Sequence, residues 1–254
     1  MMPQPGDMAG KAAIVTGAAA GLGRASALRL AQVGANICLV DIDAAKLDAV
    51  AAEVRALGVQ ALVQAVDLSV AENCPAVVAA AVEAFGRIDA LCNVAGVMIP
   101  SHSADMPLAS FQLTLNVNLA APFLLIQAAL PHLLEAKGAV VNVASAVGIT
   151  AQAYTAAYCA TKAGLIHMTK SLAMEYMHQP IRFNAVAPGG MMTELARNMM
   201  NLQDADRSLQ MRVAPLRGLV EIDDVAEMVA FLATDAADGY HGSVIVIDKG
   251  ITAG

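Results

Sequence analysis

The stretch AAIVTGAAAGLGRASALRLAQVGANICLVD, residues 12–41, decides the fold. It starts as a short apolar run, passes through a glycine-rich turn, continues with apolar residues at helical spacing, and ends in a second apolar run followed by an aspartate. Two short apolar strands joined by a helix form a βαβ unit, whose strands are parallel. We therefore expect the chain to begin as an α/β protein with a parallel sheet.

The same alternation continues along the rest of the chain. Continuously apolar, strand-like runs occur at residues 12–15, 37–40, 61–66, 88–92, 140–143, 181–186 and 244–247. Such runs are typical of parallel strands that are covered on both faces. The segments between them have helical spacing, and no linker-like tract interrupts them. The pattern predicts one domain over residues 1–254, a Rossmann-like doubly wound parallel sheet with helices on both faces.

The composition argues against several classes of protein. The 254 residues include 15 basic and 22 acidic ones, and the net charge of −7 argues against binding of nucleic acid. Prolines and polar residues interrupt the longest apolar stretch, residues 119–134, so we expect no membrane span. The N-terminal residues lack the pattern of a signal peptide. Four widely spaced cysteines predict free thiols in a reducing cytoplasm.

The glycine-rich turn is suited to hold a dinucleotide. Gly17, Gly21 and Gly23 allow backbone amides to approach a pyrophosphate, and the helix that begins at Leu22 directs its positive N-terminus at that anion. Asp41 ends the next strand, where a carboxylate can bind the ribose hydroxyls and repel a 2′-phosphate. This arrangement predicts NAD rather than NADP. The alternatives are a merely flexible turn and, for Asp41, a surface helix N-cap.

A second group of polar residues follows the fifth strand-like run. Tyr158 and Lys162 are four residues apart, so a helix places them on one face. Ser145 lies just past a strand, at the edge of the sheet where ligands bind. A Tyr/Lys pair alone is commonly an exposed surface pair. The serine at a strand end, downstream of a nucleotide-binding turn, favours a catalytic site instead.

Together, these motifs resemble the short-chain dehydrogenase/reductase family in its single-domain form. The resemblance covers the chain from about Met8 onward, and its motifs are the glycine pattern at 16–23, N-x-A-G at 93–96, Asn118, Ser145, Y-x-x-x-K at 158–162 and P-G-x-x-x-T at 188–193. Two positions depart from the family pattern. Val94 replaces a second asparagine, and Lys249 stands where a glycine is more usual.

The resemblance implies an oxidoreductase that transfers a hydride between a nicotinamide and a secondary alcohol or ketone. Tyr158 is expected to be the general acid/base, and Ser145 to hydrogen-bond the substrate oxygen. Lys162 is expected to bind the nicotinamide ribose, and Asn118 to hold a water of a proton relay, which its alternative role as a backbone-bonded helix residue partly allows. A phenolate at neutral pH needs the tyrosine pKa lowered by about three units, roughly 4 kcal/mol. We expect the Lys162 ammonium and the positive nicotinamide to supply this.

Residues after three other strands are expected to complete the cofactor site. They are predicted to contact the adenine, the ribose region and the nicotinamide in turn: Asp67 and Leu68; Asn93, Ala95 and Gly96; Pro188, Gly189, Met191 and Thr193. For Asp67 and Thr193 the alternative is a helix N-cap.

The substrate end of the site is expected in the methionine-rich segment after the sixth strand. By resemblance, residues at about 190–215 form a flap over the substrate, and this segment carries Met191, Met192, Met199, Met200 and Met211. Met98, Ile99 and Gln152 are expected to add to the pocket wall, and these side chains favour an uncharged, fairly apolar substrate. Core filling is the alternative for each methionine. The five histidines lack metal-binding spacing, so no catalytic metal is expected.

Two Ala-rich helical segments point to self-association. They follow Ser103 (to about Glu135) and Ala151 (to about His178), and by resemblance their surfaces pair copies of the chain into a homotetramer. The leading functional hypothesis is thus an NAD-dependent dehydrogenase. The alternatives are an NADPH-dependent 3-oxoacyl-thioester reductase of the same family and a non-catalytic dinucleotide-binding protein.

Overall fold

Seven parallel strands form one sheet in the computed structural model, which describes residues 4–193, 195 and 202–253. The strand order is β3-β2-β1-β4-β5-β6-β7. The strands are β1 Ala12–Thr16, β2 Asn36–Asp41, β3 Ala61–Ala65, β4 Ala90–Asn93, β5 Ala139–Val143, β6 Arg182–Pro188 and β7 Val244–Ile247. The doubly wound parallel sheet predicted from the sequence is confirmed, and each strand lies within two residues of its apolar run.

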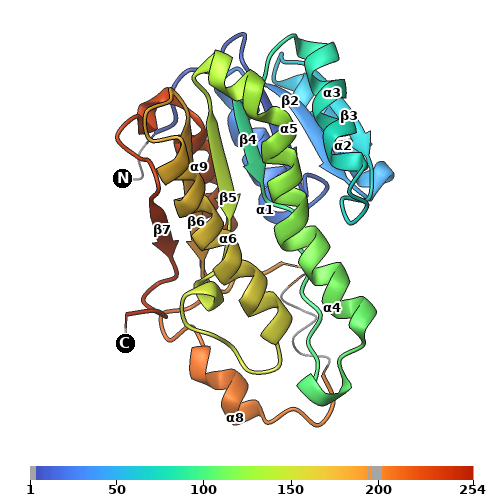
Figure 1. The fold of residues 1–254 in the computed structure, drawn as a ribbon, viewed down its shortest axis with the longest axis vertical. Coiled ribbons are helices and arrows are strands. Elements are labelled where there is room, and N and C mark those ends of the chain that lie inside the picture. The colour runs from blue at the N-terminus through green and yellow to red at the C-terminus, as the bar shows by residue number, and fades with distance from the viewer. Residues whose placement is uncertain (1–3, 194, 196–201, 254) are drawn as a thin grey trace.

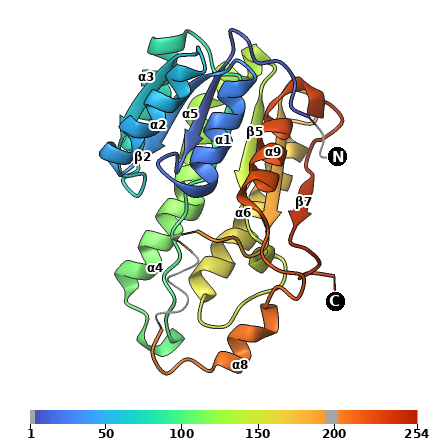
Figure 2. The ribbon, with the colours of Figure 1, turned by 180° about the vertical axis from the view of Figure 1, so that it is seen from behind.

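Helices cover both faces of the sheet. One face carries α1 Gly21–Gln32, α2 Ala44–Ala56 and α9 Ile222–Ala233 (Figure 2). The other carries α3 Asn73–Phe85, α5 Ala121–Ala136 and α6 Ala156–Glu175 (Figure 1). Shorter helical segments are η1 Ser103–Asp105, α4 Leu108–Leu115, η2 Asn116–Ala120, η3 Ala146–Gly148, α8 Arg207–Gln210, η5 Met211–Val213 and η6 Asp235–Ala237.

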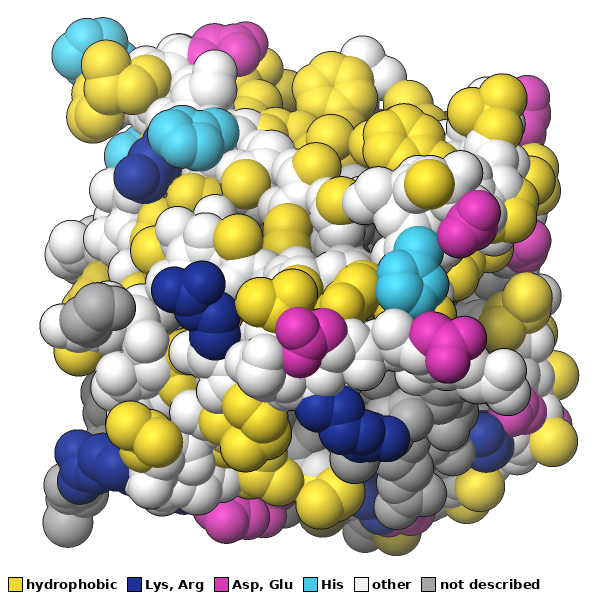
Figure 3. Space-filling view, turned by 90° about the horizontal axis from the view of Figure 1, so that it is seen from below, with side chains coloured by type: hydrophobic (Ala, Val, Ile, Leu, Met, Phe, Trp, Pro, Cys, Tyr) yellow, Lys and Arg dark blue, Asp and Glu magenta, His cyan; other side chains and the backbone are white. Residues whose placement is uncertain are grey.

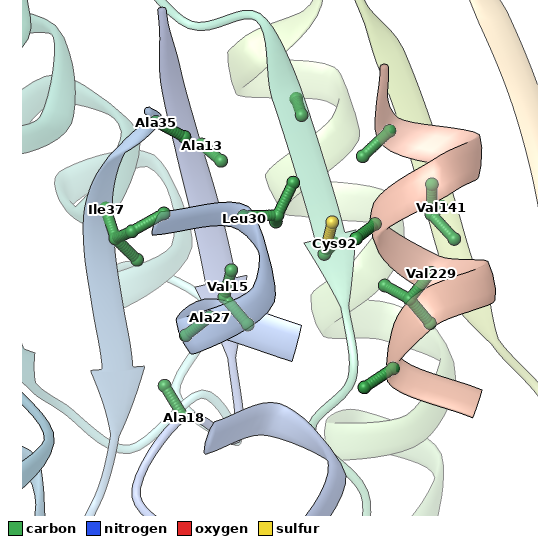
Figure 4. Close-up of a cluster of buried hydrophobic side chains, with 14 of the residues drawn as sticks. Ala13, Val15, Ala18, Ala27, Leu30, Ala35, Ile37, Cys92, Val141 and Val229 are labelled. Carbon is green, nitrogen blue, oxygen red and sulfur yellow. The ribbon is translucent and has the colours of Figure 1, made fainter. Parts of the chain in front are cut away.

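The central strands have apolar side chains on both faces because a helix layer lies on each side. Val15 of β1 packs with Leu30 of α1 and Val229 of α9 (Figure 4). Its neighbour Ile14 points to the opposite face and packs with α3 and α5 residues, as the two-residue period of a strand requires. Fully burying each such side chain contributes about 1.5–3 kcal/mol. These two core layers explain why the strand sequences are continuously apolar.

The sheet brings several distant loops to one edge. All strands are parallel, so their carboxyl ends lie together, and the chain leaves β1 toward β2 on one side while β4 pairs with β1 on the other. Ligands of open α/β sheets bind at such a reversal of strand order. The glycine-rich turn after β1 therefore lies near the loops after β4, β5 and β6.

The helical segment after Ser103 is not one regular helix. Pro107 precedes α4, and a π-helical turn, η2, separates α4 from α5. By length and composition the run Leu108–Ala136 could cross a membrane, because an 18-residue window within it has a mean hydropathy of 1.6. In this fold, however, Leu125 and Leu133 of α5 are buried in the core. The segment after Ala151 becomes helical only at Ala156 and ends at Glu175.

Candidate active site

The glycine-rich turn forms a tight cradle between β1 and α1. Gly17 and Gly21 have φ of 67° and 51°, values that favour glycine. A Cβ on Gly23 would lie 1.9 Å from the Gly17 carbonyl oxygen, and a Cβ on Gly17 would lie 2.9 Å from the Ala95 Cα. Side chains at these positions would fill the cradle. Its shape, at the N-terminus of a twelve-residue helix, fits the pyrophosphate of a dinucleotide.

Asp41 supports this cradle from the end of β2. Its Oδ2 accepts a 3.1 Å hydrogen bond from the Ala19 N–H, and its Oδ1 accepts one of 2.7 Å from Ile42. The N-cap of α2 is Asp43, which accepts from the Lys46 N–H. The alternative of a surface N-cap at Asp41 is therefore wrong. Asp41 also lines the cleft, so its carboxylate can meet a ribose there.

The loop after β4 is tied to the end of β1 by a residue that the sequence analysis gave no role. The Thr16 hydroxyl accepts hydrogen bonds from the Val94 and Ala95 N–H groups at 2.9 and 3.0 Å. This contact holds Ala95 and Gly96 at the cleft wall. Thr16 is the last residue of β1. A polar residue at this strand end could have indicated a role at the site.

Three predicted cofactor residues lie outside the cleft lining. Asn93 is buried and donates to Asn142 Oδ1 at 2.8 Å, within the sheet. Asp67 accepts a 2.8 Å hydrogen bond from the Ser69 N–H in the turn that follows β3, and Leu68 packs in the core beside it. Asp67 does not cap α3, whose N-cap position is Glu72. Asp67, Leu68 and Asn93 are therefore absent from the cleft wall that the described residues form.

Ser145, Tyr158 and Lys162 all line the cleft that the glycine cradle also lines. Tyr158 and Lys162 occupy successive turns of α6 and are 8% and 3% exposed. The Lys162 ammonium donates a 2.7 Å hydrogen bond to the Val143 carbonyl. Gly148 lets the serine loop approach α6 closely, because a Cβ there would lie 2.8 Å from the Lys162 carbonyl carbon. The alternative of an exposed Tyr/Lys pair is wrong.

Burial dominates the electrostatics of this group. It raises the pKa of Tyr158 to about 12, although a hydrogen bond with Ser145 works in the opposite direction. Burial also lowers the pKa of Lys162 to about 8. In the polypeptide itself, the lysine therefore does not produce the lowered tyrosine pKa that the sequence analysis expected. The expected shift needs a further positive charge next to the phenol.

Asn118 lies in the π-helical turn, behind the cleft wall. Its Oδ1 accepts from the Val97 N–H at 2.8 Å, and its Nδ2 donates to the Val97 carbonyl at 2.9 Å. These bonds go to the loop after β4 rather than to its own helix. A Cβ on Gly96 would lie 3.3 Å from Asn118 Oδ1 and 3.4 Å from Lys162 Nζ, so the three residues are neighbours. Asn118 is fully buried and positions the loop.

The segment after β6 contributes another part of the cleft wall. Its lining residues include four predicted ones, Pro188, Gly189, Met191 and Thr193. A Cβ on Gly21 would lie 3.7 Å from the Thr193 Cγ2, so this segment approaches the glycine cradle. The predicted flap methionines Met199 and Met200, and the helix that Thr193 would cap, lie outside the described residues.

The cleft has a volume of about 1430 Å³. Among the residues expected at its substrate end, Met98, Gln152, Met191, Met192 and Met211 line it. Figure 3 views the molecule from this end, where hydrophobic side chains are spread among a few charged ones. The lining also includes the charged residues Arg24 and Arg207, which the sequence analysis did not single out. Arg24 is paired with Glu53.

Two remaining expectations concern metals and the Lys249 position. Over the described part of the chain, no group of His, Cys, Asp or Glu side chains is arranged to hold a metal ion. Lys249 has a φ of 52°, which explains why a glycine is more usual there. Its ammonium bonds to the Leu219 carbonyl, and Leu219 lines the cleft.

A glycine cradle at the strand-order reversal of a doubly wound sheet defines a dinucleotide-binding α/β protein. Residues 17–252 match the family model described as enoyl-(acyl carrier protein) reductase. The chain is 36% identical to a 2,5-dichloro-2,5-cyclohexadiene-1,4-diol dehydrogenase of Sphingobium indicum, over 97% of this chain and 98% of that protein. It is 34% identical to a 3-oxoacyl-[acyl-carrier-protein] reductase of Thermotoga maritima, over 95% and 98%.

Among solved structures, a short chain dehydrogenase from Mycobacterium paratuberculosis bound to NAD matches with a TM-score of 0.91 and 26% identity, over 98% of this chain and 100% of that one. The chain belongs to the short-chain dehydrogenase/reductase family. It is therefore an oxidoreductase that acts on alcohol or ketone groups with a nicotinamide cofactor.

Proposed function

We propose that this protein is an NAD-dependent dehydrogenase of secondary alcohols, also able to reduce the matching ketones, with Tyr158 as general acid/base. The observation that carries the proposal is that Ser145, Tyr158 and Lys162 line the same cleft as the glycine cradle. A dinucleotide held by the cradle could therefore bring its nicotinamide to these three side chains and to a substrate beside them. We propose one domain over residues 1–254, with residues 190–215 as the substrate flap.

The side chains divide the work as follows. When bound, an oxidised nicotinamide supplies the hydride acceptor and a positive charge. The Tyr158 phenolate takes the proton from the substrate hydroxyl, and the phenol returns it in reduction. Ser145 donates a hydrogen bond to the same oxygen. Lys162 binds the nicotinamide ribose, and Asn118 orders a water next to that lysine.

The preference for NAD over NADP rests on two charged residues near the cradle. Asp41 lines the cleft with the cradle residues, and its carboxylate would repel the 2′-phosphate of an NADP bound there. Arg24 is the nearby cation that could offset this, but its guanidinium is bound to Glu53 with an Nε–Oε1 distance of 3.1 Å. The remaining cofactor contacts that we propose are at Gly17, Gly21, Leu22, Gly23, Ala95, Gly96, Pro188, Gly189, Met191 and Thr193, which line the cleft. For Asp67, Leu68 and Asn93, which lie outside that lining, the contact stays a prediction from the sequence.

A second candidate is an NADPH-dependent 3-oxoacyl-thioester reductase. The similarity to the Thermotoga maritima reductase favours it. The two candidates differ in their cofactor, NAD or NADPH, and in their substrate, a secondary alcohol or an acyl thioester. A direct comparison of NADH and NADPH affinities separates them, because a clear preference for NADPH contradicts the role given to Asp41.

We further propose a homotetramer in the cytoplasm. Phe111 of α4 and Phe123 of α5 are 39% and 43% exposed. Phe123 lines an apolar groove together with Leu115, Leu119 and Met168. Burying this surface against a second copy would remove it from water. Cys38, Cys74 and Cys92 are buried free thiols, consistent with a reducing compartment. Light scattering of the purified protein measures the oligomeric state.

The decisive experiment is a screen of secondary alcohols with NAD⁺, following NADH absorbance, for the wild type and Tyr158→Phe. Removing the hydroxyl of Tyr158 is expected to lower kcat by at least about a hundredfold. The affinity for NADH, measured by fluorescence, is expected to stay within twofold of the wild-type value. Tyr176→Phe, at the far end of α6, is the matched control. Full turnover by Tyr158→Phe would refute the acid/base assignment.

A further inference from the structure

Arg207 brings a positive charge to the substrate end of the cleft. It is the first residue of α8, the short helix beyond the carboxyl ends of the strands (Figure 1). Arg207 and Gln210 of this helix line the cleft, together with Met211 and Val213 of the turn that follows. An exposed arginine is ordinary on a protein surface, but here it borders a cleft with an apolar wall.

The other cations of the cleft have other roles. Arg24 is paired with Glu53, and the Lys162 ammonium, anchored to the Val143 carbonyl, is the group proposed to bind the nicotinamide ribose. Arg207 has no ion pair with any carboxylate in the described ranges 4–193, 195 and 202–253. Its guanidinium therefore remains available to a ligand.

The acidic residue next to Arg207 is hydrogen-bonded within its own helix. Asp206 accepts hydrogen bonds from the Ser208 N–H at 2.8 Å and from the Ser208 hydroxyl at 2.6 Å, so it caps the helix. The carboxylate is thus committed to its own helix rather than to neutralising Arg207.

Two aromatic residues hold the Arg207 segment against the cleft. The Tyr154 hydroxyl accepts a 2.9 Å hydrogen bond from the Asp206 N–H. The Tyr154 ring lies edge-on to the His102 ring, with centroids 5.0 Å apart, and His102 Nε2 is 3.3 Å from the Gln203 carbonyl oxygen. Tyr154 has a φ of 68°, a conformation that is costly for a tyrosine. A tyrosine in this unfavourable conformation therefore binds the backbone of Asp206, the residue before Arg207.

We propose that Arg207 is a specificity residue that binds a carboxylate on the substrate. Resting on the function proposed above, this names the substrate class as a secondary alcohol or ketone with an apolar body and an anionic end. Methionines of the wall contact the body, and the guanidinium fork accommodates the two carboxylate oxygens. A single guanidinium suits one negative charge, and Glu221 and Asp223 in the same lining disfavour a dianion. This differs from the uncharged substrate expected from the methionine content.

The test compares two ligands of nearly equal shape, cyclohexanecarboxylate and cyclohexanecarboxamide. Their affinities for the NADH-saturated protein are measured by calorimetry. The wild type is expected to bind the carboxylate at least about tenfold more tightly, as charge-assisted hydrogen bonds allow. Arg207→Gln is expected to remove this preference. Arg212→Gln, which makes the same change of charge at a nearby exposed residue outside the cleft lining, is expected to keep it.

A parallel kinetic measurement uses 4-hydroxycyclohexanecarboxylate and its carboxamide. Arg207→Gln is expected to raise KM for the carboxylate about tenfold or more and leave kcat within twofold. A wild-type binding preference below threefold, or one that survives in Arg207→Gln, overturns the proposal. If no alcohol is oxidised by the wild type, the proposed function fails instead, and the calorimetric comparison still decides the role of Arg207.

Discussion

The ammonium nitrogen of Lys162 lies 5.6 Å from the centre of the Tyr158 ring and is hydrogen-bonded to the carbonyl at the end of β5. The lysine is thus anchored to the sheet, and its ammonium lies over the face of the Tyr158 ring. Both groups are buried, and burial works against the charged form of each. At neutral pH the Tyr158 hydroxyl therefore stays protonated in the cofactor-free chain, and its phenolate needs a further positive charge nearby.

This burial predicts a pH dependence of stability in the cofactor-free protein. The pKa of Lys162 falls from 10.5 to about 8 on folding, so between these values the unfolded chain binds more protons than the folded one. The free energy of unfolding therefore gains a contribution that rises with pH across this window. The gain amounts to about 3 kcal/mol.

Urea unfolding of the wild type and of Lys162→Met at pH 7.5 and pH 10 measures this contribution. The difference between the two free energies of unfolding is expected to shift in favour of the wild type as the pH rises. Cysteine titration is common to both proteins and cancels. A difference that stays constant with pH would mean that Lys162 is not desolvated as described.

Asp41→Ala is expected to weaken NADH binding about tenfold to a hundredfold, because the ribose hydroxyls and the Ala19 N–H both lose an acceptor. NADPH binding should fall less, since the repulsion of its phosphate is also removed. The control is Asp43→Ala, which removes the N-cap of α2 at a cost of about 1 kcal/mol. Fluorescence titration with both cofactors gives the ratio, and an unchanged ratio in Asp41→Ala contradicts the assignment.

Gly23→Ala is expected to abolish measurable dinucleotide binding. The added methyl group would lie 1.9 Å from the Gly17 carbonyl oxygen, so the cradle has to open. Gly239→Ala is the matched control, because nothing lies within 4 Å of a Cβ at that position. Titration with NADH and thermal unfolding of both variants check this. Normal NADH affinity in Gly23→Ala would show that the cradle is not the binding element.

Tyr154→Phe isolates the hydroxyl that holds the segment before Arg207. The ring can still pack against His102, but the Asp206 N–H loses its acceptor. We expect KM for a carboxylate-bearing alcohol to rise several-fold, about the effect of one hydrogen bond, with kcat and NADH affinity within twofold. Tyr240→Phe, outside the cleft lining, is the control. An equal rise in KM for the matching carboxamide would indicate a general loosening of the cleft rather than a loss of carboxylate recognition.

The sequence was most informative where the chemistry is local. Gly17, Gly21 and Gly23 are separated along the chain by the spacing of one turn, and Tyr158 and Lys162 by the spacing of one helical turn. Such spacings fix geometry whatever surrounds them. The cradle and the Tyr–Lys face could therefore be predicted, and so could the strands, whose apolar runs match the two core layers.

The sequence could not predict which residues near the strand ends face the cleft, because this depends on how the loops pack together. Asn93 is the last residue of β4 and bonds to Asn142 within the sheet, while Ala95, two residues further on, lines the cleft. The strand-end rule does not distinguish these neighbours, because side-chain direction depends on the local backbone and its partners.

The sequence by itself determined the parallel α/β fold, the glycine cradle and the Ser145, Tyr158 and Lys162 set, because these follow from periodicity and short-range spacing. Only the tertiary structure decided that burial raises the pKa of Tyr158, that Asp41 supports the cradle through Ala19, and that Arg207 borders the substrate end. Desolvation of a side chain, hydrogen bonds between loops and the charge of a cleft all depend on residues that are distant in the chain. No local sequence pattern specifies that these residues come together.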